Sequence, residues 1–446
     1  MISRRTRCLL LISLCFLWTS AGYLSWLYRL LELLDGQGAE LTAEVLGYLL
    51  QAAGLGLAAL CVRRGGRMAG RAAFSAVIGL DAVFTALSLL LPGQQSVLVC
   101  GGGMNLLHGV IAGFYLDRLS HAADWEHRAR TFGLAYSAAT LVCWLLGRFG
   151  GGSFLASRGA VGVYAALALL TVLLLRIENP TTPDNSESRD DAPRGRLIAL
   201  AAAAVMLLSL VKGMGFSFPS KELRQGIDLE LSRVFYAVGL VAAGFLSDRE
   251  RRYGAVCCAA ALCVPFVTIS LAGQLGPSIA FWIISYLLQG FFTVFRVILF
   301  CDIAQKDARL RPVAGFGLLF GRVGDALGAL ASIALISHPA ALMVLTAALF
   351  VPAMLIFFLL YRQLYTPPPL PAKSEQQQFY DFAARYDLSS REQEVLRLIL
   401  EGRSTQEMAG LLYVTESTIK FHIHNLLKKT KCAHRVALVA HYQQTQ

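Results

Sequence analysis

The sequence has little charge. Of its 446 residues only 15% are Asp, Glu, Lys or Arg, whereas 56% are hydrophobic, and the mean hydropathy is +0.55. Because soluble globular domains carry about 25% charged residues, this composition excludes an ordinary soluble protein. The formal net charge is +11. An excess of that sign suits a nucleic-acid partner, and it also suits the arginine-rich inner loops of a membrane protein.

Motifs for catalysis and metal binding are also missing. The sequence contains no Walker sequence, no nucleophile elbow and no paired acids of catalytic type, so we assign no catalytic residue and do not expect an enzyme. Ten cysteines are present, but none has Cys-x-x-Cys spacing. Nine of them lie in or beside apolar stretches, where Cys is a small apolar filler. No metal, redox site or cofactor is therefore predicted.

Long apolar stretches fill the chain as far as residue 361. A helix needs about 20 apolar residues to cross a bilayer core. Twelve stretches have this length, at residues 8–28, 41–62, 72–91, 96–116, 131–149, 155–176, 196–218, 230–247, 253–272, 278–300, 313–336 and 340–361. The first has the basic flank of a signal peptide, but no small-x-small cleavage site closes it, so we expect a retained span.

Basic residues gather in alternate loops, which predicts the orientation. The loops on one side carry Arg4, Arg5, Arg7, Arg63, Arg64, Arg67, Arg71, Arg118, Arg128, Arg130, Arg189, Arg194, Arg196, Arg249, Arg251, Arg252, Lys306, Arg309 and Arg311. The opposite loops carry few basic residues. Since positive loops stay inside, we expect a bacterial inner-membrane protein with both termini in the cytoplasm.

A polar break divides the spans six and six. Residues 177–196 contain Pro and charges of both signs, which is typical of a linker. This layout, with Gly244–Arg252 after the eighth span, resembles the major facilitator superfamily. The equivalent loop at Arg63–Arg67 lacks the Asp, which puts active transport in doubt. A similar Gly-x-x-x-Asp-Arg at Gly113–Arg118 follows the fourth span, a position that is not repeat-equivalent, and we interpret it as coincidence.

Charged residues inside spans are costly and usually functional. They are Glu44, Asp81, Lys212, Arg296, Arg322 and Asp325. Arg322 and Asp325 are three residues apart on one helix face, so one interpretation is a structural ion pair in a span packed closely through its glycines. The other is that Arg296 and Arg322, with Asp325 beside them, face a central cavity and bind an acidic ligand. His108 is interpreted as an interior His and not as a ligand.

Residues 388–442 have helical spacing and clear helix starts. Ser389 with Glu392 and Ser404 with Glu407 form capping boxes, and Thr415 can cap a third helix. The apolar positions are Val395, Ile399, Met408, Leu412, Ile419, Ile423 and Leu426. A tight turn joins the second and third helices, which predicts a helix-turn-helix whose second helix enters the DNA major groove. The alternative is a small helical bundle with a solvated basic face.

The outer face of the third predicted helix is basic. It carries Ser417, Lys420, Phe421, His424 and Lys428. Lysine can donate to guanine, and an exposed phenylalanine can contact a thymine methyl. Lysines at the end of the helix can neutralise phosphates.

This segment resembles the LuxR-type (GerE-type) DNA-binding domain. The matching residues are Leu388, Arg391, Glu392, Glu394, Val395, Leu396, Gly402, Glu407, Ala409, Thr415, Thr418, Ile419, Lys420, His422, Lys429 and Arg435. The resemblance implies that Lys420, Phe421 and His424 face bases and that Thr415, Thr418 and Lys429 lie near phosphates. It also implies a dimerisation helix at about His434–Gln443 and a homodimer on double-stranded DNA. Related domains often have a longer basic residue at the position of His424, and we expect a neutral His there to shift the preferred site or to weaken binding.

The predicted fold is all-α, with a major-facilitator-like membrane domain followed by a LuxR-type domain. The predicted parts are a first membrane half (1–176), a cytoplasmic linker (177–195), a second membrane half (196–361), a Pro-containing linker (362–387) and the DNA-binding domain (388–446). The predicted function is a membrane-bound transcription regulator, in which the spans sense a small molecule. The alternative is a working transporter with a regulatory tail.

Overall fold

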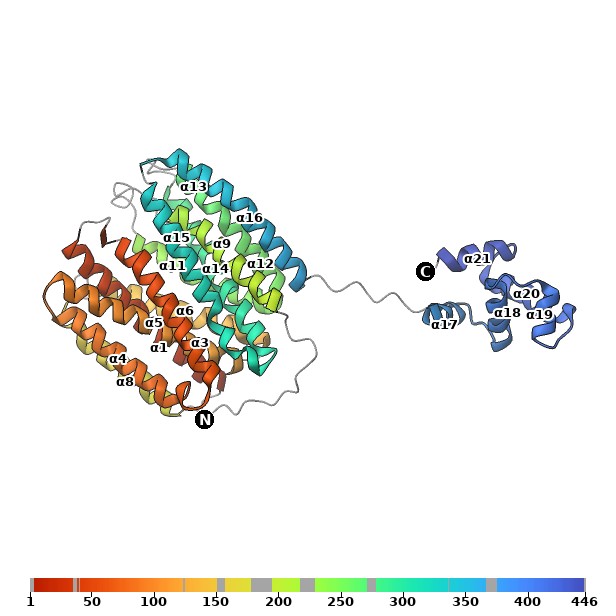
Figure 1. Cartoon of the computed structure of the whole chain (residues 1–446), viewed down its shortest axis with the longest axis horizontal. Helices are drawn as coiled ribbons and strands as arrows, with labels where there is room; N and C mark the ends of the chain where they lie inside the picture. Colours follow the sequence, from red (N-terminus) through yellow and green to blue (C-terminus); the bar gives the residue numbers. More distant parts are fainter. Residues whose placement is uncertain are drawn as a thin grey trace. The chain divides into compact units, whose positions relative to one another are not determined.

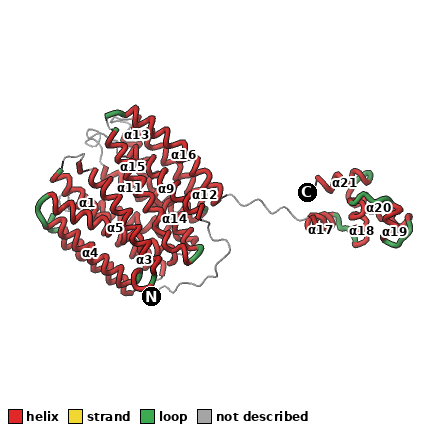
Figure 2. Tube along the Cα trace, in the orientation of Figure 1, coloured by secondary structure: helices red, strands yellow, loops and turns green. Residues whose placement is uncertain are grey.

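The chain divides into two compact units, Met1–Tyr365 and Thr366–Gln446 (Figure 1). The computed structural model describes residues 4–34, 38–39, 41–122, 125–150, 157–177, 195–216, 229–270, 278–335, 337–365 and 375–444. Over these residues all regular structure is helical, as predicted (Figure 2). The two predicted linkers fall largely at residues 178–194 and 366–374, outside the described ranges, so their boundaries stay predictions.

Within the described residues, helices occupy all twelve predicted spans. They are α1 (Arg4–Leu33), η1 (Leu41–Leu46) with α3 (Gly47–Arg64), α4 (Arg71–Leu90), α5 (Gln94–Ala122), α6 (Arg128–Gly150), α8 (Ala160–Ile177), α9 (Gly195–Phe216), α11 (Leu229–Arg249), α12 (Arg251–Ala260) with η4 (Ala261–Cys263) and α13 (Val264–Ser270), α14 (Ser278–Gln305), η5 (Ala308–Gly315) with α15 (Phe316–Ala334), and α16 (Pro339–Tyr365). Two short 3₁₀ turns are η2 (Gly66–Met68) and η3 (Trp125–His127). Among the described residues, ten helices are long and apolar enough to cross a membrane, and Ala160–Arg176 is a shorter apolar helix.

Glycines of α15 let two helices approach it closely. A Cβ on Gly317 would lie 1.8 Å from the carbonyl oxygen of Arg296 on α14, and one on Gly324 would lie 2.2 Å from a carbonyl oxygen of α9. No side chain fits in that space, so backbone packs directly on backbone. This packing brings Arg296 of α14 and Lys212 of α9 onto the same carboxylate, Asp325 of α15.

Ion pairs join the first half of this unit (α1–α8) to the second (α9–α16) at one end of the helices. Asp117 at the end of α5 accepts two hydrogen bonds from the guanidinium of Arg311, at 3.1 and 2.8 Å. Arg128 at the start of α6 pairs with Asp302 of α14. Arg251 at the start of α12 donates to the other oxygen of Asp302 at 2.7 Å. We call Asp117, Arg128, Arg251, Asp302 and Arg311, together with Asp248, the end-face network.

Asp248 extends the end-face network to the start of a helix in the other half. Its two carboxylate oxygens accept the backbone N–H groups of Ala129 and Arg130, each at 2.9 Å. A carboxylate is stabilised at a helix N-terminus because the unsatisfied N–H groups carry partial positive charge. Arg251 also donates to Asp248 at 2.8 Å. Asp117 of the Gly113–Arg118 sequence also ties the two halves together, through its hydrogen bonds from Arg311.

The second unit is a small helical domain with its own core. Its helices are α17 (Glu375–Arg385), α18 (Ser390–Leu400), α19 (Thr405–Leu411), α20 (Glu416–Thr430) and α21 (Arg435–Gln444). The buried hydrophobic residues are Phe379, Phe382, Ala383, Leu388, Val395, Leu396, Ile399, Met408, Ala409, Ile419, Ile423, Leu426, Leu438 and Tyr442. The Phe382 ring lies 5.1 Å from that of Tyr442, so α17 packs against α21.

Candidate DNA-binding surface and membrane cavity

A short turn joins α19 to α20. Both predicted capping boxes are present, at Ser389 and Ser404. Tyr413 adopts the left-handed conformation with φ 53°, and the N–H of Val414 donates to the carbonyl of Ala409 at 3.0 Å. The hydroxyl of Thr415 then accepts the N–H of Thr418 and starts α20. The helix-turn-helix geometry therefore follows from local hydrogen bonds in this segment.

The two faces of α20 differ as the apolar spacing predicts. Ile419, Ile423 and Leu426 are buried. The opposite face exposes Lys420, Phe421, His424 and Lys428, and the Phe421 side chain is 61% exposed although it is aromatic. A row of exposed cations and rings along one helix is the pattern that reads base edges and phosphates.

The two threonines at the start of α20 bond to each other. The hydroxyl oxygens of Thr415 and Thr418 lie 2.9 Å apart, and that of Thr415 is also 2.8 Å from the hydroxyl of Ser417. Thr415 is exposed and Thr418 is half-buried. These hydroxyls cluster at a helix N-terminus, a position that suits contact with a phosphate.

The environment of Lys429 differs from the predicted one, because its ammonium group makes hydrogen bonds within the domain. It donates to Glu392 Oε2 at 2.7 Å and to the carbonyl of Asp387 at 2.6 Å. The same oxygen of Glu392 accepts the N–H of Ser389 at 2.7 Å. Burial acts to raise the pKa of Glu392, but the hydrogen bonds from Lys429 and Ser389 outweigh burial and hold the pKa below its usual value. This pair joins α18 to α20, and a phosphate contact by Lys429 stays a prediction.

Replacing Glu392 by Gln should therefore destabilise the second unit in a pH-dependent way. Because the native pKa is lowered, the stabilisation is fully present above the unfolded-state pKa of about 4.3 and disappears as pH falls through the native value. We expect Glu392→Gln to lower the free energy of unfolding at pH 7 by about 1–3 kcal/mol. Urea denaturation of the isolated unit at several pH values measures this. Glu394→Gln is the matched control, because the half-exposed Glu394 pairs only with the exposed Arg391 among the described residues. An equal loss from Glu392→Gln at pH 3 and pH 7 would contradict the assignment.

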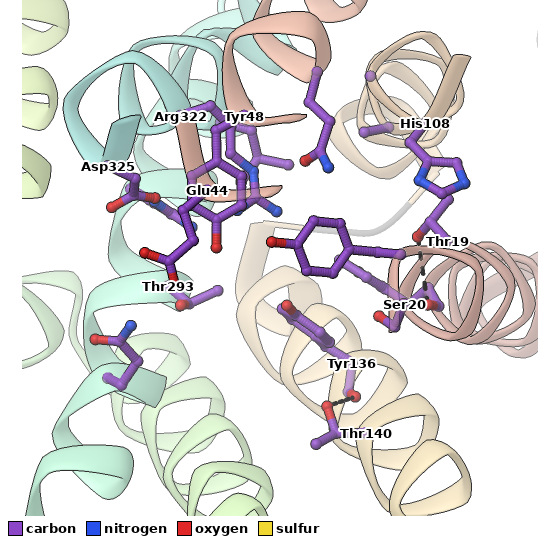
Figure 3. Close-up of a pocket in the computed structure, with 18 of the residues that line it drawn as sticks. Thr19, Ser20, Glu44, Tyr48, His108, Tyr136, Thr140, Thr293, Arg322 and Asp325 are labelled. Carbon is purple, nitrogen blue, oxygen red and sulfur yellow. Dashed lines mark hydrogen bonds and ion pairs between the residues drawn. The ribbon is translucent and has the colours of Figure 1, made fainter. Parts of the chain in front are cut away.

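The first unit contains a cavity of about 330 Å³ between its halves (Figure 3). Its walls come from α1, η1, α3, α5 and α6 of the first half and from α9, α11, α14 and α15 of the second. The polar and aromatic lining residues include Phe16, Thr19, Ser20, Tyr23, Glu44, Tyr48, Gln51, His108, Tyr115, Tyr136, Thr140, Lys212, Tyr236, Tyr286, Gln289, Thr293, Arg296, Arg322 and Asp325. A cavity of this size with convergent polar groups is typical of a small-molecule site.

The predicted ligand residues all line this cavity, but their pairing differs from the prediction. Asp325 binds Lys212 and Arg296, each at 2.9 Å, and these are the only ion pairs of Asp325 among the described residues. The ion pair between Arg322 and Asp325, one of the two interpretations of the sequence, is not among these pairs. Sequence analysis noted Lys212 as a charge within a span but did not assign it to the site, because only α9 packing on α15 makes it a partner of Asp325.

Arg322 has a different environment from Arg296. Its guanidinium lies over the Tyr48 ring, 4.5 Å from the ring centroid. Within the described part of the chain it makes no hydrogen bond or ion pair, and it lies on the same wall as Glu44 and Tyr48 (Figure 3). Three cations (Lys212, Arg296 and Arg322) and two carboxylates (Glu44 and Asp325) line the cavity, which leaves one excess positive charge when all are ionised.

Comparison with known proteins identifies the second unit. Residues 387–442 match the model of the family described as "Bacterial regulatory proteins, luxR family". The LuxR-type helix-turn-helix domain predicted from the sequence is therefore confirmed.

The first unit is similar to solved transporter structures. The fucose:proton symporter FucP of E. coli matches with a TM-score of 0.58 and 15% identity, over 81% of this chain and 99% of that chain. FucP in its outward conformation, a major facilitator superfamily transporter, gives 0.54 and 14%, over 79% and 97%. The nucleoside transporter NupG gives 0.51 and 13%, over 80% and 100%. At these identities the similarity concerns the fold, and the predicted major-facilitator-like fold is confirmed.

Proposed function

We propose that this protein is a membrane-bound transcription regulator, in which a small acidic molecule bound in the membrane cavity controls sequence-specific DNA binding by the second unit. The observation that carries the proposal is the presence, in one chain, of a LuxR-family domain and a helical membrane unit with a charged cavity. The DNA-binding domain provides a means of regulating transcription, and the cavity provides a binding site for a small signal molecule.

DNA recognition is assigned to α20. Lys420 is positioned on the exposed face to donate to guanine, and Phe421 to contact a thymine methyl. His424 and Lys428 continue this face, and Thr415 and Thr418 lie at its N-terminal end, where a phosphate is favoured. The proposed homodimer forms through α21, as the resemblance to LuxR-type domains implies.

The isolated second unit, Lys373–Gln446, tests the DNA-binding part. We expect it to bind double-stranded DNA weakly, with an affinity that falls steeply as salt rises, because phosphate contacts release counterions. Fluorescence anisotropy with the DNA upstream of the protein's own gene, measured from low to physiological salt, gives the slope. No binding to any duplex at low salt would remove the proposal, whereas equal binding to all duplexes would remove only its sequence specificity.

The charges that line the cavity indicate the chemical class of the ligand. Arg296 is neutralised by Asp325, whereas Arg322 is stacked on Tyr48 without a hydrogen-bonding partner among the described residues. A planar guanidinium binds a carboxylate through two hydrogen bonds. Arg322 is therefore the proposed primary contact, with Arg296 and Asp325 as a second pair that a ligand can rearrange.

The end of α16 offers a route from the cavity to the tail. Leu364 and Tyr365, the last residues of the first unit, line a cavity of about 210 Å³ together with Arg251, Asp302 and Lys306. Arg251 and Asp302 belong to the end-face network, so a rearrangement of the two halves would change the packing at Tyr365. A ligand drives such a change only if it binds the two arrangements with different affinity.

The proposed location is the bacterial inner membrane, with both termini and residues 177–195 in the cytoplasm. The support is the arginine bias of the loops. In whole cells, we expect Ser186→Cys and Gln94→Cys variants to react from opposite sides with a membrane-impermeant maleimide, in a background from which reactive native cysteines are removed. Reaction from the same side at both positions would contradict this topology.

A transporter with a regulatory tail is the second candidate. The cavity between the two halves and the end-face network that joins them favour it, since a transporter needs a site between two halves and contacts that can hold one arrangement of them. Uptake of a radiolabelled ligand into membrane vesicles separates the candidates. A regulator responds to the ligand without accumulating it, whereas a transporter accumulates it.

A further inference from the structure

A helix that precedes the family match is part of the core of the second unit. The match to the LuxR family covers residues 387–442, whereas α17 ends at Arg385. Two rings of α17, those of Phe379 and Phe382, are nonetheless buried in the same hydrophobic cluster as the apolar residues of the matched helices. α17 is therefore an integral part of this folded unit, although the family match does not include it.

A tight turn fixes α17 to the helix that follows. Asp387 adopts the left-handed conformation, with φ 46°, and the N–H of Leu388 donates to the carbonyl of Ala383 at 2.9 Å. Helices commonly end in this way, because the turn satisfies carbonyl groups that have no partner within the helix. On α18, the guanidinium of Arg397 lies 4.6 Å from the centroid of the Phe379 ring. These contacts hold α17 against α18.

α17 and the residues of this turn also contact the last helix, α21. The hydroxyl oxygen of Tyr386 and Nε2 of His441 lie 2.6 Å apart, which is a hydrogen-bond distance. The Phe382 ring makes edge contacts with the rings of Tyr442 and His441, at centroid distances of 5.1 and 6.0 Å. Aromatic pairs at such distances attract each other beyond the effect of apolar burial. The position of α21 therefore depends on residues that precede α18.

One face of α21 stays exposed. Leu438 and Tyr442, one turn apart, are buried. Val436, Ala440 and Gln443 are exposed and lie on the opposite face, because residues three or four positions apart share one face of a helix. A second copy of this unit can therefore contact the exposed face of α21 while Phe382 and Tyr386 hold its other side.

We propose that α17 positions α21 for the pairing of two copies of the second unit on DNA, with Phe382 and Tyr386 as the positioning residues. This inference rests on the proposed homodimer through α21. In a symmetric dimer the same surface is used by both copies, so a displacement of α21 acts twice at one interface. Neither positioning residue belongs to α20, so one copy can read its bases without them.

Two DNA duplexes separate this role from a general effect on the fold. The first carries the promoter segment that the protein protects in a footprint, and the second is the same duplex with one half replaced by unrelated sequence. A dimer reads two half-sites about one helical turn apart, whereas a single copy reads one. The wild type should therefore bind the intact duplex more tightly. Fluorescence anisotropy with the purified full-length protein in detergent measures both affinities.

Substitutions of the two positioning residues then test the proposal. Tyr386→Phe removes only the hydroxyl that bonds to His441, and Phe382→Leu removes the ring but keeps an apolar side chain. We expect each to weaken binding to the intact duplex by about two- to tenfold, the change that loss of one hydrogen bond or one ring pair causes. Binding to the halved duplex should not change. The matched control is Tyr380→Phe, which removes a hydroxyl from the exposed side of α17 and should affect neither duplex.

The possible outcomes separate this inference from the proposed function. An equal loss on both duplexes in Tyr386→Phe, or no loss in either variant, would overturn the role of α17. Equal affinity of the wild type for both duplexes would remove the proposed homodimer and this inference with it. Failure of the wild type to bind either duplex would remove the proposed DNA binding on which both depend.

Discussion

Arg322→Gln is expected to weaken strongly the ligand response of a reporter gene controlled by the full-length protein. Glutamine keeps most of the volume but removes the cation stacked on Tyr48. A hydrogen bond to a charged group contributes about 1.5–3 kcal/mol, so about 10- to 150-fold more ligand would be needed for the same occupancy. The measurement is the dose–response of the reporter to a panel of small carboxylic acids, with the isolated second unit of the same protein still binding DNA.

Three further variants make this result specific. Arg296→Gln should weaken the response without abolishing it, since Asp325 keeps Lys212 as a partner at 2.9 Å. Arg322→Lys keeps the charge but loses the planar geometry, and it should restore part of the response. Arg29→Gln is the matched control, because Arg29 pairs with Glu32 on the surface of α1 and not with the cavity. A normal response in Arg322→Gln would discard the cavity as the ligand site.

Lys420→Ala is expected to weaken binding of the second unit to its preferred DNA by about 1–3 kcal/mol, which is about 5- to 150-fold, and to reduce discrimination between sequences. Lys420 is exposed on α20, so truncation should not change the stability of the fold. The measurement combines a promoter footprint with competition between specific and nonspecific duplexes. An unchanged footprint would show that α20 does not read the bases.

Two neighbouring lysines on α20 act as controls. Lys428→Ala should weaken binding to all sequences and reduce the salt slope by about one, as expected for a phosphate contact. Lys429→Ala should instead destabilise the domain, because Lys429 binds Glu392 at 2.7 Å. The thermal melting temperature therefore separates Lys429→Ala from the other two variants before any DNA is added.

The elements of both units are readable from local patterns. Apolar runs of membrane-spanning length predicted the long helices in the described part of the first unit. Capping residues at Ser389, Ser404 and Thr415 predicted where helices begin in the second unit. These features depend on hydrophobic spacing and on hydrogen bonds between residues three or four positions apart. Such interactions are determined within a single helix, so a sequence is enough to find them.

The partners of the charged residues were not predictable in the same way. Arg322 and Asp325 are three positions apart, and local spacing favours their pairing. The structure instead pairs Asp325 with Lys212, which is more than a hundred positions away, because glycines of α15 admit α9 and α14 at backbone distance. Packing between different elements likewise brings together Asp117 and Arg311, Lys429 and Glu392, and Asp81 and His108.

The sequence by itself determined the class of this protein: a helical membrane unit followed by a LuxR-type DNA-binding domain, with Lys420, Phe421, His424 and Lys428 on the outer face of one helix. Periodicity and composition are properties of the sequence itself, so they can be read without knowledge of tertiary contacts. Only the tertiary structure decided which charges are neutralised, which cation is left for a ligand, and which buried acid faces a histidine. Coulomb and hydrogen-bond energies depend on distance in space, and helix packing sets those distances between residues far apart in sequence.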